Sequence, residues 1–117
     1  MDDVEKLISK VGGHVTRPCY RYLEEAVRCC LEMEEFPRGQ LTKILYPMVA
    51  QRFGLKGRRA GKTVSRAVAR AVADTWDCGD RGKLQAIAGG EWRGRPTPGE
   101  LLYYLRKELL EGRTAEV

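Results

Sequence analysis

The chain has no apolar stretch long enough to cross a membrane and no secretory signal. It begins Met-Asp-Asp-Val-Glu-Lys, without the positive charge and the apolar run of a signal peptide. It has no Cys-x-x-Cys pair, and its only histidine, His14, sits in a turn without a neighbour at metal-ligand spacing. We therefore expect a cytoplasmic protein without a metal site, in which at least one of Cys29 and Cys30 is a buried small apolar residue.

Catalytic motifs are also missing. The run Gly61-Lys62-Thr63 looks like the end of a nucleotide phosphate-binding loop, but Lys56 stands where such a loop needs its first glycine. No serine, histidine and aspartate set and no pair of carboxylates in an apolar segment suggests an active site. We expect no enzyme activity, no cofactor and no small-molecule substrate.

Acidic residues are absent from one contiguous third of the chain. Between Phe36 and Ala73 there is no Asp or Glu, whereas nine of the 21 basic residues lie in that segment. The rest of the chain therefore has twelve basic residues against all 16 acidic ones. A surface that is merely solvated normally mixes both signs, so this segregation favours a polyanionic partner, and double-stranded DNA above all.

The residues that are present are typical of one folded helical domain. The 117 residues, of which 43% are hydrophobic and 32% charged, can bury one modest core. Apolar residues recur at helical spacing, and no convincing alternating strand occurs. We predict a single all-α domain over residues 1–117, a compact bundle of about six helices unrelated to the winged helix.

Glycine, proline and capping residues predict where the helices begin and end. The first helix ends at Gly12, and the second begins near Pro18. A short helix is predicted over 83–88. The closing helix begins after Thr97, because Glu100 stands three residues later and completes a capping box.

Residues 40–77 are predicted to form a helix-turn-helix. In the segment from Gln40 to Phe53, Pro47 either kinks one helix or divides it into two short pieces. Its predicted buried face consists of Leu41, Ile44, Leu45, Met48, Val49 and Phe53. The second helix begins at Lys62, and its predicted buried face consists of Val64, Ala67, Val68, Ala71, Val72 and Trp76.

The opposite face of this second helix is the predicted DNA surface, which lies between Arg52 and Arg70. Helical spacing places Arg66 and Arg70 side by side among small side chains, so the helix can enter a major groove. The preceding turn supplies further cations for phosphates. The predicted DNA-binding residues are Lys56, Arg58, Arg59, Lys62, Thr63, Ser65, Arg66, Ala69 and Arg70.

The same region resembles a known family. Leu-Thr-Lys-Ile-Leu-Tyr-Pro at 41–47, followed by Phe53, Val64 and Trp76, resembles the C-terminal effector domain of stage-zero sporulation protein A. Tyr-Leu-x-Glu-Ala at 22–26 and Arg-Pro-Thr at 95–97 extend the resemblance over nearly the whole chain. It implies six helices, a recognition helix in the major groove of a short operator, and control of transcription at the onset of sporulation.

The resemblance also implies how neighbouring parts are arranged. Like the tryptophan that matches it in the family, Trp76 is expected to pack against the helix over 41–53. A receiver domain normally precedes this effector domain, but the match begins close to Met1, so we expect no receiver in these 117 residues, and the chain is either a stand-alone relative or an excised effector domain. Binding to DNA as a homodimer or as tandem copies is compatible with the resemblance.

The recognition helix departs from the family's pattern. The family's arginine, glutamate, arginine and histidine are replaced here by Thr63, Ser65, Ala69 and Arg70. The turn before the helix is also about four residues longer, and its extra length contains Arg58 and Arg59. We therefore expect DNA binding at an operator that differs from the family's.

Three functions agree with these features. The favoured one is a sequence-specific transcription regulator that reads the major groove with the helix over 62–77. The second is binding to structured RNA, or to nucleic acid without sequence preference. Competition between duplex DNA and RNA distinguishes this function from sequence-specific DNA binding. The third is a protein adaptor that retains the fold, which a lack of salt-sensitive nucleic-acid binding would favour.

Overall fold

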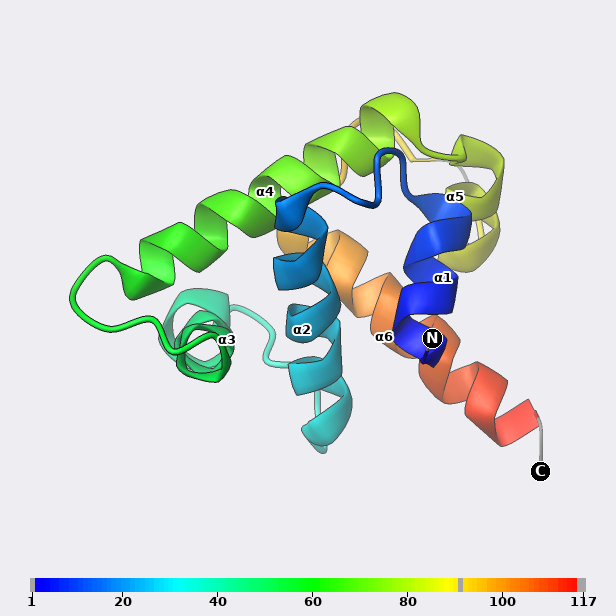
Figure 1. Ribbon diagram of the computed structural model, residues 1–117. Coiled ribbons are helices and arrows are strands. Elements are labelled where there is room, and N and C mark those ends of the chain that lie inside the picture. The colour runs from blue at the N-terminus through cyan, green and yellow to red at the C-terminus, as the bar shows by residue number, and fades with distance from the viewer. Residues whose placement is uncertain (1, 91, 116–117) are drawn as a thin grey trace.

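The computed structural model describes residues 2–90 and 92–115, with the backbone alone for 113–115 (Figure 1). The helices are α1 (Asp3–Val11), α2 (Pro18–Glu32), α3 (Tyr46–Arg52), α4 (Ala60–Cys78), α5 (Arg81–Ala88) and α6 (Pro98–Ala115). The described residues contain no strand, which confirms the predicted all-α bundle of six helices. None of these helices is both long and apolar enough to span a bilayer.

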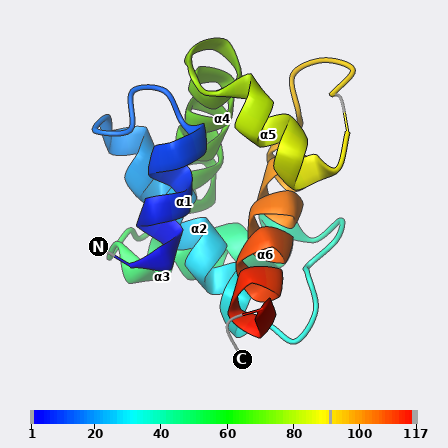
Figure 2. The same ribbon diagram turned by 90° about the vertical axis from the view of Figure 1, so that its right-hand side faces the viewer.

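One hydrophobic cluster receives residues from every helix. Helix α2 lies at its centre, because it packs against α1, α3, α4 and α6. Figures 1 and 2 show α1 and α5 near the C-terminal end of α4, α3 beneath its N-terminal end, and α6 running behind α2 and away from α4. The long helix α4 therefore projects past the rest of the bundle on one side.

Pro47 divides the helix that was predicted over 40–53. A π-helical turn, Leu41–Leu45, leads into α3, and Pro47 occupies the first turn of α3. Proline is tolerated there because the first turn of a helix needs no backbone donor at that position. The structure thus has the second of the two predicted alternatives, two short pieces that meet at Tyr46 and Pro47.

Two residues assigned to the buried face of that segment are exposed instead. Ile44 is 44% exposed and Phe53 38% exposed, whereas Leu45 and Val49 are fully buried. The π-turn is wider than an α-helical turn, with the Tyr46 N–H bonded to the Leu41 carbonyl five positions earlier, so the spacing of an ordinary α-helix does not apply to Ile44. Phe53 lies beyond the end of α3, where its ring stacks on Tyr22 with the ring centroids 4.4 Å apart.

Trp76 does not pack against α3, so that expectation was wrong. It lies near the C-terminal end of α4, about 24 Å along the helix from Ala60, whereas α3 lies beside the N-terminal end. The Trp76 side chain is half-buried. Its ring faces Arg81, whose guanidinium carbon lies 4.0 Å from the ring centroid, and Arg81 Nε donates to the Trp76 carbonyl.

Helix α6 begins with the predicted capping box. The Thr97 N–H donates to Glu100 Oε1 over 2.9 Å, and the Glu100 N–H donates to Thr97 Oγ1 over 3.2 Å. These bonds satisfy backbone groups that the first turn of a helix leaves unpaired. The helix then buries Leu101, Leu102 and Leu105 in the core.

The capping box leads to a prediction about stability. Thr97→Ala removes the side-chain acceptor of the Glu100 N–H and should lower the free energy of unfolding by about 1 kcal/mol. Urea unfolding of the purified protein measures this change. Thr42→Ala is the control, since Thr42 is an exposed threonine outside any cap. Equal stability of the two variants would show that the box contributes nothing.

Candidate nucleic-acid interface

Helix α4 has one buried face and one open face. Its buried residues contact α2 and α3, which confirms the predicted face except for Trp76. In the first two-thirds of the helix they are Val64, Ala67, Val68, Ala71 and Val72. The N-terminal half of α4 extends beyond α2, so the other side of that half faces solvent (Figure 1).

The predicted DNA-binding residues all lie on this open side or in the turn before it. Ser65 is half-buried, and the remaining eight are exposed. Those eight are Lys56, Arg58, Arg59, Lys62, Thr63, Arg66, Ala69 and Arg70. The small side chains of Ser65 and Ala69 keep the surface between the cations low, as a helix that enters a groove requires.

Several of these residues line one shallow hollow. Its lining consists of Arg59, Lys62, Thr63, Arg66 and Arg70. Four of the five are cations. Thr63 helps to shape the first turn, because its hydroxyl donates to the Arg59 carbonyl over 3.1 Å. Such converging positive charge attracts an anion of phosphate size.

The start of α4 adds to this positive potential. The helix begins at Ala60, two residues before the predicted Lys62, and Arg59 at its N-cap supplies no side-chain hydrogen bond. No acidic residue lies in the first turn. The Ala60 N–H donates to the Gly57 carbonyl over 3.3 Å, but the N–H groups of Gly61 and Lys62 and the positive end of the helix dipole are available to an anion in the same place as the cations.

The turn at 53–59 positions the other cations. Gly54 and Gly57 have φ angles of 69° and 95°, a region that only glycine adopts without strain. These two bends reverse the chain between α3 and α4. They leave Lys56 and Arg58 exposed on either side of Gly57. The turn thus extends the basic surface beyond the helix itself.

None of the surface cations forms an ion pair with a carboxylate within the described part of the chain. They are Lys56, Arg58, Arg59, Lys62, Arg66 and Arg70. Arg52 differs, because its guanidinium binds Glu25 and Glu32 of α2, and the bond to Glu25 raises the pKa of Arg52. The unpaired cations therefore begin at Lys56, within the range between Arg52 and Arg70 that was predicted from the sequence.

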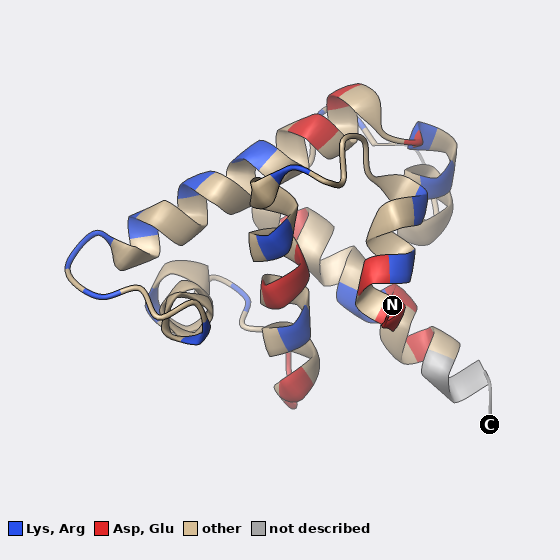
Figure 3. Ribbon diagram, in the orientation of Figure 1, with Lys and Arg blue, Asp and Glu red and all other residues tan. Residues whose placement is uncertain are grey.

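The charge of α4 changes sign along its length. Figure 3 shows basic residues in the turn and in the N-terminal half of the helix, and acidic residues near its C-terminal end. The acidic residues are Asp74 and Asp77. The N-terminal half of α4 is therefore its positive half, and an anion is attracted there more strongly than to the C-terminal half.

The C-terminal half of α4 is held by a buried carboxylate. Asp74 is 8% exposed, and its Oδ2 accepts hydrogen bonds from the backbone N–H of His14 and the hydroxyl of Tyr20, each over 2.7 Å. Burial alone raises the pKa of Asp74, but the bonds from His14 and Tyr20 outweigh it and hold the pKa well below its usual range. Arg17 pairs with Oδ1 over 3.2 Å.

Sequence reasoning placed His14 in a turn but missed this network. The residue does lie in the connection between α1 and α2, and its ring nitrogen Nδ1 is 2.9 Å from Asp74 Oδ1. One available signal was the position of Asp74, three residues after Ala71 on the edge of the apolar face. A carboxylate there must find partners when the helix packs.

A comparison with protein-family models agrees with this geometry. The model described as "Sporulation initiation factor Spo0A C terminal" matches residues 4–109 of the 117. The match includes all of α2 to α5 and most of α1 and α6. This family consists of DNA-binding domains and is not an enzyme family.

Proposed function

Because the chain belongs to the family of the Spo0A C-terminal domain, a DNA-binding effector domain of a sporulation regulator, we propose that it regulates transcription by binding DNA sequence-specifically. Helix α4 enters the major groove with its N-terminal half. The observation that supports this proposal best is the hollow of unpaired cations on that half of α4.

The proposed contacts fall into two groups. Arg66 and Arg70 lie on the open face of α4, where a guanidinium can bond both acceptors of a guanine. Thr63, Ser65 and Ala69 lie on or beside this face and touch the base edges between them. The phosphates are bound by Lys56, Arg58, Arg59 and Lys62, from the turn and the start of the helix.

Two copies of the chain on one duplex would extend this contact. A homodimer or a tandem pair places its two recognition helices in successive major grooves, about 34 Å apart along the DNA. The length of DNA protected at saturation distinguishes one copy from two. Selection of bound fragments from a random duplex library yields the operator, and the spacing of its repeats gives the arrangement.

A mutation test separates base reading from phosphate binding. Arg66→Ala should lower the affinity for the selected duplex by about 1 to 3 kcal/mol and relax the preference at one base pair, since a bidentate arginine contact contains sequence information. The double variant Arg58→Ala, Arg59→Ala should weaken selected and scrambled duplexes alike. Binding titrations of both variants on both duplexes measure the difference.

Controls for that test come from the other end of the molecule. Lys83→Ala removes one positive charge from α5, away from the proposed surface, and should leave both affinities unchanged. If Arg66→Ala lowers both affinities equally while the turn variant alone changes sequence preference, the turn reads the bases instead of α4. Equal competition by structured RNA and by the selected duplex would contradict sequence-specific DNA binding.

A further inference from the structure

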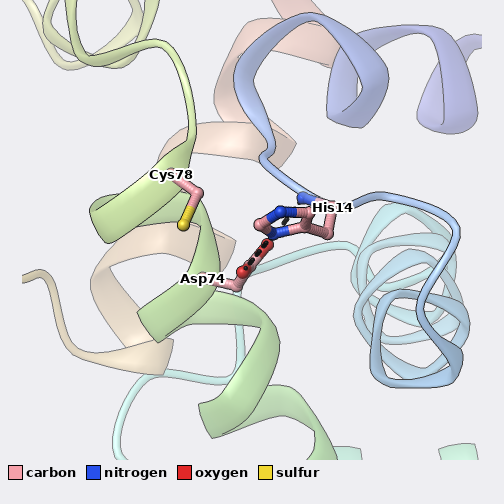
Figure 4. A group of neighbouring side chains, drawn as sticks. All are labelled: His14, Asp74 and Cys78. Carbon is pink, nitrogen blue, oxygen red and sulfur yellow. Dashed lines mark hydrogen bonds and ion pairs between the residues drawn. The ribbon is translucent and has the colours of Figure 1, made fainter.

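Beside the C-terminal half of α4, one side chain from early in the sequence meets two that lie 60 or more positions later. They are His14 from the connection between α1 and α2, and Asp74 and Cys78 from successive turns of α4 (Figure 4). Their possible ligand atoms all lie within 4.8 Å of one another. The Cys78 sulfur points toward the space beside His14 and Asp74. The proposed DNA contacts use none of these three groups.

We propose that His14, Asp74 and Cys78 bind a divalent transition-metal ion, with Zn²⁺ as the best match. A thiolate, an imidazole and a carboxylate oxygen are the three donor types that zinc prefers in proteins. Around a tetrahedral zinc ion with bonds of 2.0 to 2.3 Å, ligand atoms lie about 3.3 to 3.6 Å apart. The 2.9 Å between His14 Nδ1 and Asp74 Oδ1 needs to widen only slightly.

The carboxylate is already oriented for this role. Its other oxygen, Oδ2, is held by the His14 backbone N–H and the Tyr20 hydroxyl, each at 2.7 Å. The Tyr20 hydroxyl also accepts a bond from the Gly13 N–H over 3.0 Å. Bonds of this kind around a metal-binding carboxylate fix its direction and strengthen binding. Oδ1 is consequently directed at the His14 ring.

The three ligand atoms, which now lie within 4.8 Å of one another, must settle about 3.3 to 3.6 Å apart around the ion, and three further changes accompany this. The Cys78 thiol releases its proton to solvent, and the His14 ring carries its proton on the nitrogen away from Asp74, so that Nδ1 can bind the ion. Arg17, which is 3.2 Å from Oδ1, must move away. Its side chain is 56% exposed, so it can turn into solvent. The three side chains help to line a second hollow, together with Arg17, Pro18 and Cys19. The fourth position on the ion faces this second hollow, where water completes the coordination.

A bound ion would connect two parts of the fold. It would join the connection between α1 and α2 to the last turns of α4, the helix whose first turns form the basic surface. Because the unfolded chain holds these residues far apart, binding stabilises the folded state. The inference does not depend on DNA binding, so either one can fail without the other.

The experiment titrates the reduced, chelator-treated full chain with Zn²⁺ alone. We expect one equivalent to bind and, at about one hundred times the dissociation constant, to raise the melting temperature by roughly 9 to 13 °C. Cys78→Ser and His14→Gln should each weaken binding at least tenfold. Cys19→Ser is the matched control, because Cys19 lines the same hollow but is outside the group of three. It should bind as the wild type does.

Titration with Co²⁺, which accepts the same ligands, identifies the thiolate directly. The wild type and Cys19→Ser should show a sulfur-to-cobalt charge-transfer band that Cys78→Ser lacks. Since Cys78 is exposed, Cys78→Ser should keep the fold, and its spectrum is decisive even where His14→Gln unfolds. A fall in affinity of less than tenfold for Cys78→Ser, or a retained cobalt band, overturns the proposal.

Discussion

Affinity for duplex DNA is expected to fall by about 10² to 10³ when the salt concentration rises from 50 to 200 mM. The unpaired cations on α4 and in the turn before it can neutralise four to six phosphates, and each contact releases condensed counterions. The slope of log affinity against log salt is then about −0.9 for each phosphate. Fluorescence anisotropy over a salt series measures this slope.

Charge-removal variants show which cations produce the salt dependence. The double variant Arg58→Ala, Arg59→Ala should flatten the slope by about one unit for each phosphate contact that is lost. Lys107→Ala, on α6, removes a charge that pairs with Glu111 and should leave the slope unchanged. A change of less than about threefold in wild-type affinity over the same salt range would show that the basic face does not bind phosphates.

The parts of the fold that were predicted correctly depend on neighbours in the sequence. The capping box at Thr97 needs only a residue three positions away, and it formed as expected. The start of α2 at Pro18 also follows from local backbone preferences. Helix α1 ends at Gly12 as predicted, but Gly12 is extended, with a φ of −78°, and does not form the left-handed cap on which that prediction rested. The buried face of α4 was predictable because helical spacing repeats along the chain.

Helical spacing failed where the backbone departs from an ordinary α-helix. Ile44 sits in the π-turn before Pro47, and its side chain points to solvent although an α-helical count places it inside. Trp76 has the spacing of a buried residue, but α4 is longer than the segment that packs on α3. The spacing of apolar residues predicts which face of a helix is buried. The positions of the neighbouring helices determine how far along that face the packing extends.

Long-range pairings were not predictable from the sequence. Arg52 stands in the basic segment, yet its guanidinium binds Glu25 and Glu32, which lie 20 or more positions earlier. Asp74 and His14 are separated by 60 positions. Their contact depends on the angle between α2 and α4, which no local pattern determines.

The replacement Gly79→Ala should lower the free energy of unfolding by about 3 kcal/mol, because no space exists for a methyl group. A Cβ atom at Gly79 would overlap the backbone carbonyl oxygens of Val11 and Thr75. Both oxygens are in use: Thr75 O accepts the Gly79 N–H over 2.9 Å, and Val11 O accepts the Asp80 N–H over 3.0 Å. Moving Thr75 O breaks the last hydrogen bond of α4, and moving Val11 O breaks the bond that joins the residue after α4 to α1.

For a domain of this size such a loss lowers the melting temperature by roughly 10 to 15 °C, which thermal unfolding followed by circular dichroism measures. Gly61→Ala is the matched control, since Gly61 lies in the first turn of the same helix with nothing within 4 Å of an added Cβ. It should leave stability unchanged or raise it by up to about 1 kcal/mol, because alanine favours a helix more than glycine does. If Gly79→Ala instead melts within two or three degrees of the wild type, α1 does not approach the end of α4 as closely as the structure shows. The connection that holds His14 against Asp74 would then have a different position as well.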